Sequence, residues 1–350
     1  MKQVLVIRLS ALGDVAMAIP VVYSLAESYP DVQFTFVTQP AAAGLFINRP
    51  DNLSVFPADV KGRYCGPGGM FRLFRELRKK YRFDVMADLH DVLRTRILRY
   101  LFGISGIRAV CINKERDAKK RLTRRRNKEK KPLKTSFERY ADVFGRLGFA
   151  FRPEFVSMYG KGRGDRNIFS DICAVKEGVC RIGIAPFAKH RGKIYPPESM
   201  EKVVRYFACG GNQVFLFGGG KEESRILADW AARYPNTVCM AGKYGFEKEL
   251  ALISWLDVMV SMDSANMHLA SLVGVPVVSV WGATHPYAGF MGWRQDMRNS
   301  IGAHLCCRPC SVFGNKPCFR GDYACLKNIC PEMIIGRVES ILNGKKDCSE

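Results

Sequence analysis

The sequence predicts an α/β protein with two domains, each built around a parallel sheet. Three observations lead to this prediction. Short apolar runs alternate with longer amphipathic stretches along the chain, as strands and helices do in βαβ units. Several of the runs end in polar or glycine-containing loops, which in parallel sheets form the ligand-binding edge. The length of 350 residues exceeds what a single hydrophobic core usually serves.

The composition is that of a globular protein without a membrane span. Hydrophobic residues make up 47% of the chain, and no apolar run approaches the roughly 20 residues that cross a bilayer. The apolar run at the N-terminus is short and is interrupted by Arg8, which argues against a secretory signal. We therefore expect a cytoplasmic protein whose 13 cysteines are reduced thiols or metal ligands.

The strong positive charge predicts an anionic partner. The net charge is +21 and the pI is near 9.6, which suits nucleic acid, an acidic membrane surface or a phosphorylated substrate. The densest run, Lys114–Lys134, contains no aromatic residue, so it is a poor platform for single-stranded nucleic acid. We interpret it as a flexible arm that reaches anionic lipid or phosphorylated glycan, with a solvated mobile loop as the alternative.

In the first half of the chain, chemistry-bearing residues follow the predicted strands. Asp14 lies in the loop after the first strand, which matches neither a dinucleotide fingerprint nor a P-loop. It could act as a general base or cap the next helix. His90 and Asp91, at the end of a later strand, could line the same cleft or be ordinary loop residues. The predicted strands are Val4–Leu9, Gln33–Val37 and Val85–Leu89; the predicted helices are Val15–Glu27, Met70–Lys80, Val92–Leu101 and Phe137–Leu147.

The second half repeats this rhythm after a linker at Gly160–Asp165. Lys193, in the loop after its first strand, could neutralise a diphosphate. Gly218–Gly220 would let a ligand approach the backbone closely. Glu222 could then accept hydrogen bonds from a ribose, or simply favour the helix dipole. The predicted strands are Arg181–Ala185, Gln213–Phe217, Val238–Met240, Val258–Met262 and Val277–Trp281.

The stretch Val258–Pro286 forms the most informative strand–helix–strand unit. Asp263 and Ser264, both favoured N-cap types, precede a short helix, Ala265–Val273. A helix N-terminus at the carboxyl edge of a sheet suits a phosphate. A carboxylate would repel that phosphate, so we expect Asp263 either to bind sugar hydroxyls or only to cap the helix.

Six cysteines crowd into Cys306–Cys330. Cys307 and Cys310 have the spacing of zinc ligands, but no second CxxC pair follows. We expect structural thiols here and no metal. A metal site and a redox-sensitive disulfide remain as alternatives. The candidate metal ligands would be Cys307, Cys310, Cys318 and Cys325.

Four of these stretches together give the chain a family resemblance. They are IRLSALGDVAMAIPVVYSL at Ile7–Leu25, KIYP at Lys193–Pro196, AGK at Ala241–Lys243, and DSANMHLASLVGVPVVSVWGATHP at Asp263–Pro286. Over most of its length the chain resembles glycosyltransferase family 9, the ADP-heptose:lipopolysaccharide heptosyltransferases. One departure is Ser264-Ala265, where many members have Thr-Gly; the hydroxyl and the main-chain N–H survive that change.

The resemblance implies a GT-B architecture, with two Rossmann-like domains facing across a cleft. Residues 1–160 would form the acceptor-binding domain and residues 161–330 the nucleotide-sugar-binding domain. Residues 331–350 would form a terminal helix and tail that pack back on the first domain.

The resemblance also implies roles for individual residues. Asp14 matches the base, Lys193 the lysine that holds the diphosphate, and Asp263 the acid that binds heptose hydroxyls. His90 and Asp91 remain weaker candidates for acceptor contacts. The other donor contacts would be Ser264, Ala265 and His268 on the phosphate side, and Glu222 and Tyr244 at the ribose and adenine.

The implied activity is inverting transfer of heptose from ADP-heptose to a phosphorylated lipopolysaccharide inner-core or lipid-linked acceptor. No cofactor, metal or nucleic acid is expected to take part. The enzyme would be cytoplasmic, with a peripheral position on the inner membrane as a further option. One alternative is a related transferase that uses another nucleotide sugar. An alternative of a different class is a basic protein that binds nucleic acid or an anionic surface.

Overall fold

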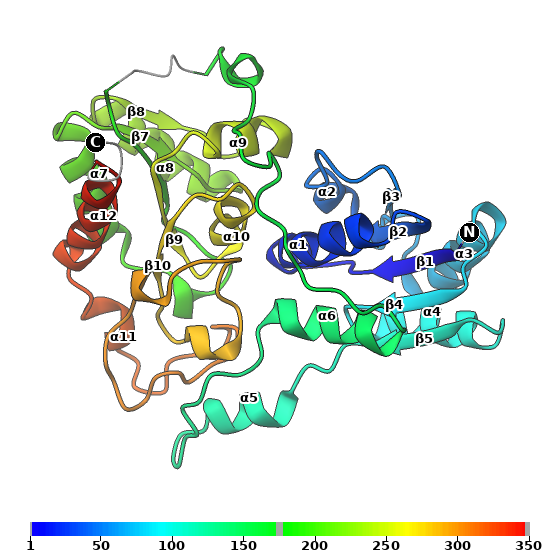
Figure 1. Ribbon diagram of the computed structural model, residues 1–350. Coiled ribbons are helices and arrows are strands. Elements are labelled where there is room, and N and C mark those ends of the chain that lie inside the picture. The colour runs from blue at the N-terminus through cyan, green and yellow to red at the C-terminus, as the bar shows by residue number, and fades with distance from the viewer. Residues whose placement is uncertain (1, 173–177, 347–350) are drawn as a thin grey trace. The chain divides into compact units, whose positions relative to one another are not determined.

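The computed structural model describes residues 2–172 and 178–346, which form two compact units (Figure 1). Unit 1 comprises Met1–Lys114 and Thr135–Met158, and unit 2 comprises Glu115–Lys134 and Tyr159–Glu350. The junction after Met158 lies close to the boundary expected from the sequence. The segment Glu115–Lys134 differs from that expectation, because it belongs to unit 2 although it lies within the first half of the chain.

Unit 1 contains a five-stranded parallel sheet in the order β3-β2-β1-β4-β5. The sequence did not predict β3 and β5. Both are edge strands, and β5 has no fully buried residue, so neither shows a clear apolar run. The strands are β1 (Lys2–Ile7), β2 (Val32–Thr38), β3 (Leu53–Pro57), β4 (Val85–Asp88) and β5 (Arg108–Cys111); the helices are α1 (Leu12–Ser28), α2 (Pro40–Ala43), α3 (Gly66–Lys80), α4 (Leu93–Gly103) and α6 (Ser136–Arg146).

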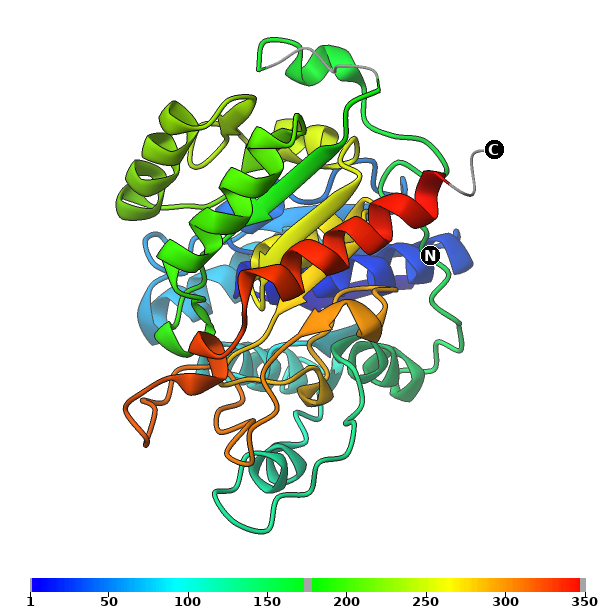
Figure 2. The ribbon, with the colours of Figure 1, turned by 90° about the vertical axis from the view of Figure 1, so that its left-hand side faces the viewer.

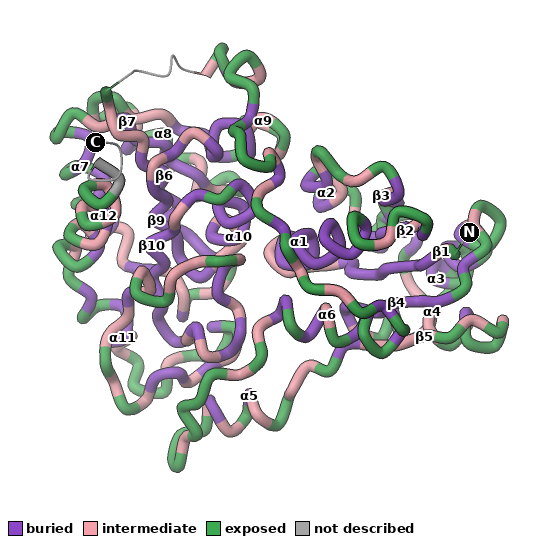
Figure 3. The backbone as a smooth tube through the Cα atoms, in the orientation of Figure 1, coloured by how far each residue is buried: buried purple, intermediate pink, exposed green. Residues whose placement is uncertain are grey.

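Unit 2 contains a six-stranded parallel sheet in the order β11-β10-β9-β6-β7-β8. Its central strands are buried along their length, as expected for a sheet covered on both faces (Figure 3). The strands are β6 (Arg181–Ala185), β7 (Gln213–Leu216), β8 (Thr237–Cys239), β9 (Val258–Met262), β10 (Val277–Val280) and β11 (Ser300–Ile301). The helices are α5 (Arg116–Leu122), α7 (Pro197–Cys209), α8 (Lys221–Arg233), α9 (Phe246–Ile253), α10 (Ala265–Leu272), α11 (Ala324–Lys327) and α12 (Pro331–Lys346).

The terminal helix α12 packs within unit 2. Ile334 and Val338 are fully buried in the same cluster as Met200 and Val203 of α7. Figure 2 shows the helix, in red, running beside the strands of the second sheet, with which it makes contacts at β9 and β10. Packing of this helix on the first domain, which the resemblance implied, stays a prediction. The last four residues of the predicted tail lie outside the described residues.

The basic segment is folded onto unit 2. It contains helix α5, and its Lys128 ammonium donates hydrogen bonds to the carbonyl oxygens of Cys307 (2.8 Å) and Pro309 (2.6 Å). The Lys119 ammonium lies 4.6 Å from the centre of the Phe290 ring. The expectation of a flexible arm or mobile loop was wrong, because several of its cations have fixed partners within the unit. Among the described helices, none combines the length and the apolar character needed to cross a bilayer.

Candidate active site

In unit 1, Asp14 is held in place by two donors. Its Oδ2 atom lies 2.6 Å from Nη2 of Arg8 and accepts a hydrogen bond from the Ala11 N–H at 3.2 Å. The buried Arg8 also donates from Nη1 to the Leu89 carbonyl oxygen at 2.6 Å, which ties the loop after β1 to the loop after β4. The Asp14 side chain remains 28% exposed. It is thus positioned and still accessible to a substrate.

Asp14 is not the N-cap residue that one reading of the sequence suggested. Helix α1 begins at Leu12 and its N-cap is Ala11, so Asp14 lies in the first turn. An acid at this position interacts favourably with the positive end of the helix dipole. The cap interaction that exists runs from the Ala11 N–H to the Asp14 carboxylate.

His90 lies in the same region of unit 1 and is buried. Burial, together with the positive charges of Arg8 and Lys114, lowers the pKa of His90 to about 3. The imidazole is therefore neutral near pH 7. Its Nδ1 atom makes no hydrogen bond within the part of the chain that the structure describes. A neutral imidazole with one unused nitrogen can exchange a hydrogen bond with a bound hydroxyl group.

Asp91, the other predicted acceptor residue, is engaged by arginines. Its carboxylate receives two hydrogen bonds from Arg96, at 2.9 Å and 3.2 Å, and lies 3.5 Å from Arg99. The hydrogen bond from Arg96 lowers the pKa of Asp91. The buried Asp88 shapes this loop, because its Oδ1 accepts from the N–H groups of both His90 and Asp91 at 2.9 Å. These contacts favour a structural role for Asp91.

Sequence reasoning did not single out Arg8 and Asp88. Both are charged residues at the end of an otherwise apolar strand, and both are buried. Burial of a charge is costly unless a partner compensates it. The sequence pattern that could have identified Arg8 and Asp88 is therefore a charged residue at the end of an apolar run.

In unit 2, the structure brings Lys193 and Asp263 together. The Lys193 Nζ atom lies 2.8 Å from Asp263 Oδ2, and the two side chains are 15% and 4% exposed. They meet because they follow β6 and β9, which are neighbouring strands with Ala185 paired to Ser261. Gly314, with φ of +73°, packs on the lysine stem, where a Cβ atom would lie 2.6 Å from Lys193 Cγ. The stem is thus confined and its ammonium group neutralises a buried carboxylate.

The N-terminus of α10 adjoins this pair. Ser264 occupies the N-cap position, yet its side chain makes no capping hydrogen bond; its Oγ lies 3.3 Å from Oγ of Ser261. Ala265 is the first helical residue, and His268 is buried in the first turn. The first-turn N–H groups therefore lack a side-chain cap from Ser264. Such a helix end can bind an anion.

Glu222 and Tyr244 lie at the same sheet edge, after β7 and β8. Glu222 is exposed and pairs with Arg225 at 2.8 Å, which lowers the pKa of Glu222. The neighbouring Glu223 is the acid that folds back on the glycine loop, where it accepts from the Gly219 N–H at 2.8 Å. The Tyr244 ring lies 5.3 Å from the Lys248 ammonium. The predicted ribose and adenine roles of Glu222 and Tyr244 remain predictions.

The cysteine-rich stretch forms a cluster of thiols. Burial raises the pKa of Cys325 to about 11 and also raises that of Cys310, so both thiols are protonated near pH 7. Within the described residues, no three His, Cys, Asp or Glu side chains are arranged to hold a metal ion. The candidate ligands that line one small cavity of about 10 Å³ are Cys307, Cys310, Cys318 and Cys325.

Comparison with known proteins bears on both the fold and the family. The lipopolysaccharide core heptosyltransferase OpsX of Haemophilus influenzae is 24% identical over 304 residues, which cover 81% of this chain and 80% of that protein. A family 9 glycosyltransferase from Veillonella parvula has a TM-score of 0.75 at 18% identity and 98% coverage of each chain. The Escherichia coli heptosyltransferase WaaC, solved with ADP, has a TM-score of 0.66 at 16% identity, covering 97% of this chain and 99% of that one.

The structural likeness confirms the predicted α/β fold of the GT-B class. The profile of glycosyltransferase family 9 (heptosyltransferase) matches residues 70–316. Because this match spans more than half of the 350 residues, the chain belongs to glycosyltransferase family 9, the heptosyltransferase family.

Proposed function

We propose that this glycosyltransferase moves heptose from ADP-heptose to a phosphorylated lipopolysaccharide core acceptor, with inversion at the anomeric carbon. The observation that carries the proposal is the buried pair of Lys193 and Asp263 beside the uncapped N-terminus of α10. The pair provides a cation that can bind a diphosphate and a carboxylate that can bind sugar hydroxyls. Membership of the family and the names of the relatives, which are lipopolysaccharide heptosyltransferases, support the choice of substrates.

In this proposal, the donor diphosphate takes positive charge from two sources. The Lys193 ammonium has three N–H donors, so it can keep its ion pair with Asp263 and also donate a hydrogen bond to the diphosphate. The first-turn N–H groups of α10 supply the second source. Negative charge grows on the diphosphate as the glycosidic bond breaks, so these groups stabilise the transition state more than the ground state. No metal or cofactor takes part in the proposed step.

On the acceptor side, Asp14 takes the proton from the attacking hydroxyl group. The oxygen then attacks the anomeric carbon on the face opposite the leaving diphosphate, which inverts its configuration. The contacts from Arg8 and Ala11 orient the carboxylate, and the exposed part of Asp14 gives the hydroxyl access. The neutral His90 supplies a further hydrogen-bonding group beside the acceptor.

Calorimetric titration with ADP, UDP and GDP at physiological ionic strength tests the choice of donor. We expect selective binding of ADP, because the proposed donor is ADP-heptose. Salt has to be kept moderate, since a protein of charge +21 attracts any nucleotide at low ionic strength. A preference for UDP or GDP would identify a transferase with another donor. Absence of nucleotide binding would leave the basic surface as the functional feature.

We further propose that the outer face of α3 contacts an anionic membrane surface. This face carries exposed Arg72, Arg75, Arg78 and Lys79 beside Phe71, which is 50% exposed. The same side chains line an open groove of about 970 Å³. Basic side chains near an anionic leaflet contribute about 1 kcal/mol each, and an exposed aromatic ring can enter the interface. In this proposal, α3 makes the contact with anionic lipid that the sequence analysis expected from the basic segment.

Sedimentation with vesicles that contain anionic lipid tests this surface. The triple variant Arg72→Gln, Arg75→Gln, Arg78→Gln is expected to bind at least tenfold more weakly, because three cations leave one face. A matched control removes three exposed cations from the basic segment instead: Lys120→Gln, Arg124→Gln, Arg126→Gln. Equal losses in both variants would show that total charge, and not α3, determines membrane binding.

A further inference from the structure

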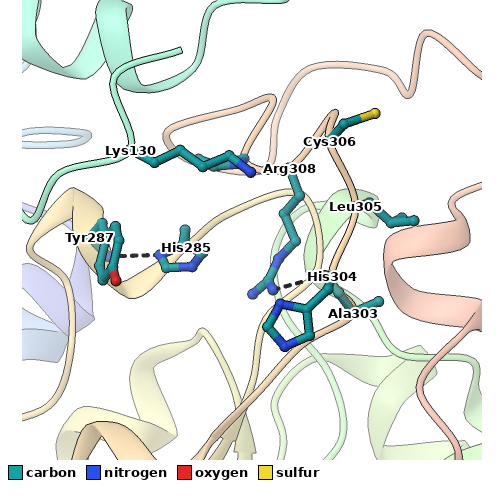
Figure 4. A pocket seen from close by; sticks show the side chains of 9 residues that line it. Lys130, His285, Tyr287, Ala303, His304, Leu305, Cys306 and Arg308 are labelled. Atoms are coloured by element: carbon teal, nitrogen blue, oxygen red, sulfur yellow. Dashed lines mark hydrogen bonds between the residues drawn. The ribbon is translucent and has the colours of Figure 1, made fainter.

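A second cavity in unit 2, separate from the Lys193–Asp263 pair, has two cationic side chains and two histidines in its lining. It has a volume of about 280 Å³ and includes Lys130, His285, Tyr287, His304 and Arg308 among its lining residues. Figure 4 shows the side chains of Lys130, His285, His304 and Arg308 around a common space. We call this cavity the anion pocket. Its residues come from the basic segment and from the loops that follow β10 and β11.

Arg308 is the buried charge of the anion pocket, only 8% exposed. Its Nε atom donates to the carbonyl oxygens of Gly282 (2.9 Å) and Thr284 (3.2 Å), and its Nη1 donates to that of Ala303 (3.2 Å). These partners are neutral dipoles. Among the described residues, no carboxylate forms an ion pair with Arg308 or with Lys130. A buried cation without a counter-ion is costly, so an anionic ligand would stabilise this arrangement.

The basic segment is attached to both sides of the anion pocket. Lys128 donates to the carbonyl oxygens of Cys307 and Pro309 on one side. The Leu133 N–H donates to the Tyr287 carbonyl oxygen on the other side, at 2.9 Å. Lys130 lies between these two attachments. The two attachments hold this part of the backbone beside the pocket, which Lys130 lines.

His285 adds a neutral donor. Its Nδ1 accepts a hydrogen bond from the Tyr287 N–H at 3.1 Å, which leaves the imidazole proton on Nε2. Burial, followed by the charges of Arg308 and Lys130, lowers the pKa of His285 to about 4. An anion in the pocket would oppose those charges. The resonances of His285 should therefore respond directly to occupancy.

The position of the anion pocket distinguishes it from the proposed donor site. Along the sheet edge, Glu222, Lys193 and Asp263 follow β7, β6 and β9, in spatial order. His285 follows β10, one strand further, on the side away from β7 and β8. A nucleotide sugar laid from β7 to β9 would thus have its sugar end nearest β10. In the proposed reaction, the acceptor lies next to that sugar.

We propose that the anion pocket binds an oxyanion of the acceptor, a phosphate or a carboxylate carried close to the accepting sugar. The proposal rests on the proposed function for the identity of the acceptor. The pocket itself rests on Arg308, Lys130 and the two histidines. Its volume exceeds that of a phosphate group, so part of the sugar that carries the anion would also enter.

Histidine NMR spectra of the full chain, titrated with inorganic phosphate, test the pocket directly. We expect the resonances of His285 and His304, which line the pocket, to shift. Lys130→Gln should weaken phosphate binding roughly five- to twentyfold, since one charge-assisted hydrogen bond is lost. The matched control is Lys131→Gln, the exposed neighbour that does not line the pocket, which should bind like the unsubstituted protein. Unshifted His285 resonances, or equal losses in both variants, would overturn the proposal.

Two further comparisons assign the ligand. If the anion belongs to the acceptor, Lys130→Gln raises the acceptor KM by the same factor and leaves kcat and the affinity for ADP unchanged. Phosphatase treatment of a phosphorylated acceptor, or methyl esterification of a carboxylate, should then remove the difference between variant and unsubstituted protein. A parallel loss of ADP affinity in Lys130→Gln would contradict the proposal, because the pocket would then serve the nucleotide. Failure of the unsubstituted protein to bind ADP would count against the proposed function, whereas the response of His285 to phosphate and its weakening in Lys130→Gln judge the pocket.

Discussion

Replacing Asp14 by asparagine is expected to lower kcat by roughly 10³-fold and to leave the affinity for ADP unchanged. The amide cannot take a proton from the acceptor hydroxyl. It keeps an oxygen that can still accept from Arg8 and from the Ala11 N–H, so the loop should retain its conformation. The measurement is the initial rate of transfer at saturating donor and acceptor, paired with calorimetric titration of ADP.

Two comparisons isolate the role of Asp14 as a base. Asp31→Asn removes one exposed carboxylate from the same unit and should keep normal rates. Asp14→Ala is a poorer probe than Asp14→Asn, because it leaves the buried Arg8 guanidinium without its carboxylate and should also lower the free energy of unfolding. A rate near normal in Asp14→Asn would exclude Asp14 as the base and turn attention to the neutral His90.

Replacing Lys193 by methionine is expected to reduce the free energy of unfolding by about 3–5 kcal/mol. The cause is the carboxylate of Asp263, which is 4% exposed and would lose its ion-pair partner. Methionine retains most of the aliphatic stem that packs on Gly314, so the loss reports the charge more than the packing. Denaturant unfolding of the two proteins at pH 7 measures this difference.

The double variant Lys193→Met, Asp263→Asn should recover much of that stability, because the buried negative charge is gone. Lys248→Met is the matched control: its ion pair with Asp171 has the same length, 2.8 Å, but Asp171 is 60% exposed. An exposed pair contributes less than about 1 kcal/mol, so this variant should unfold almost normally. Equal effects of Lys193→Met and Lys248→Met would mean that the buried pair does not persist in solution.

These variants also separate stability from donor binding. Both Lys193→Met and the double variant lack the cation proposed for the diphosphate, so ADP should bind roughly tenfold to a hundredfold more weakly in each. If the double variant is stable and yet binds ADP normally, Lys193 serves folding and another group holds the diphosphate. The double variant is needed because weaker ADP binding in Lys193→Met could result either from the lost cation or from the lower stability of that variant.

The sequence by itself determined the buried centre of each sheet. The apolar runs predicted β6 and β9 with their observed bounds, because a strand covered on both faces needs consecutive apolar residues. The motifs also predicted the family, which the match over residues 70–316 confirms; the stretches around Lys193 and Asp263 lie inside that match. Each of these features depends on residues that are neighbours in the sequence.

Tertiary structure alone decided which charges meet. Lys193 and Asp263 are distant in sequence, and only the pairing of β6 with β9 brings them to 2.8 Å. The same holds for Arg308, whose burial depends on two loops, and for the basic segment, whose cations look solvated until their carbonyl partners are known. Local patterns report how well a residue tolerates burial. The partner that compensates a buried charge comes from elsewhere in the chain, so the fold has to supply it.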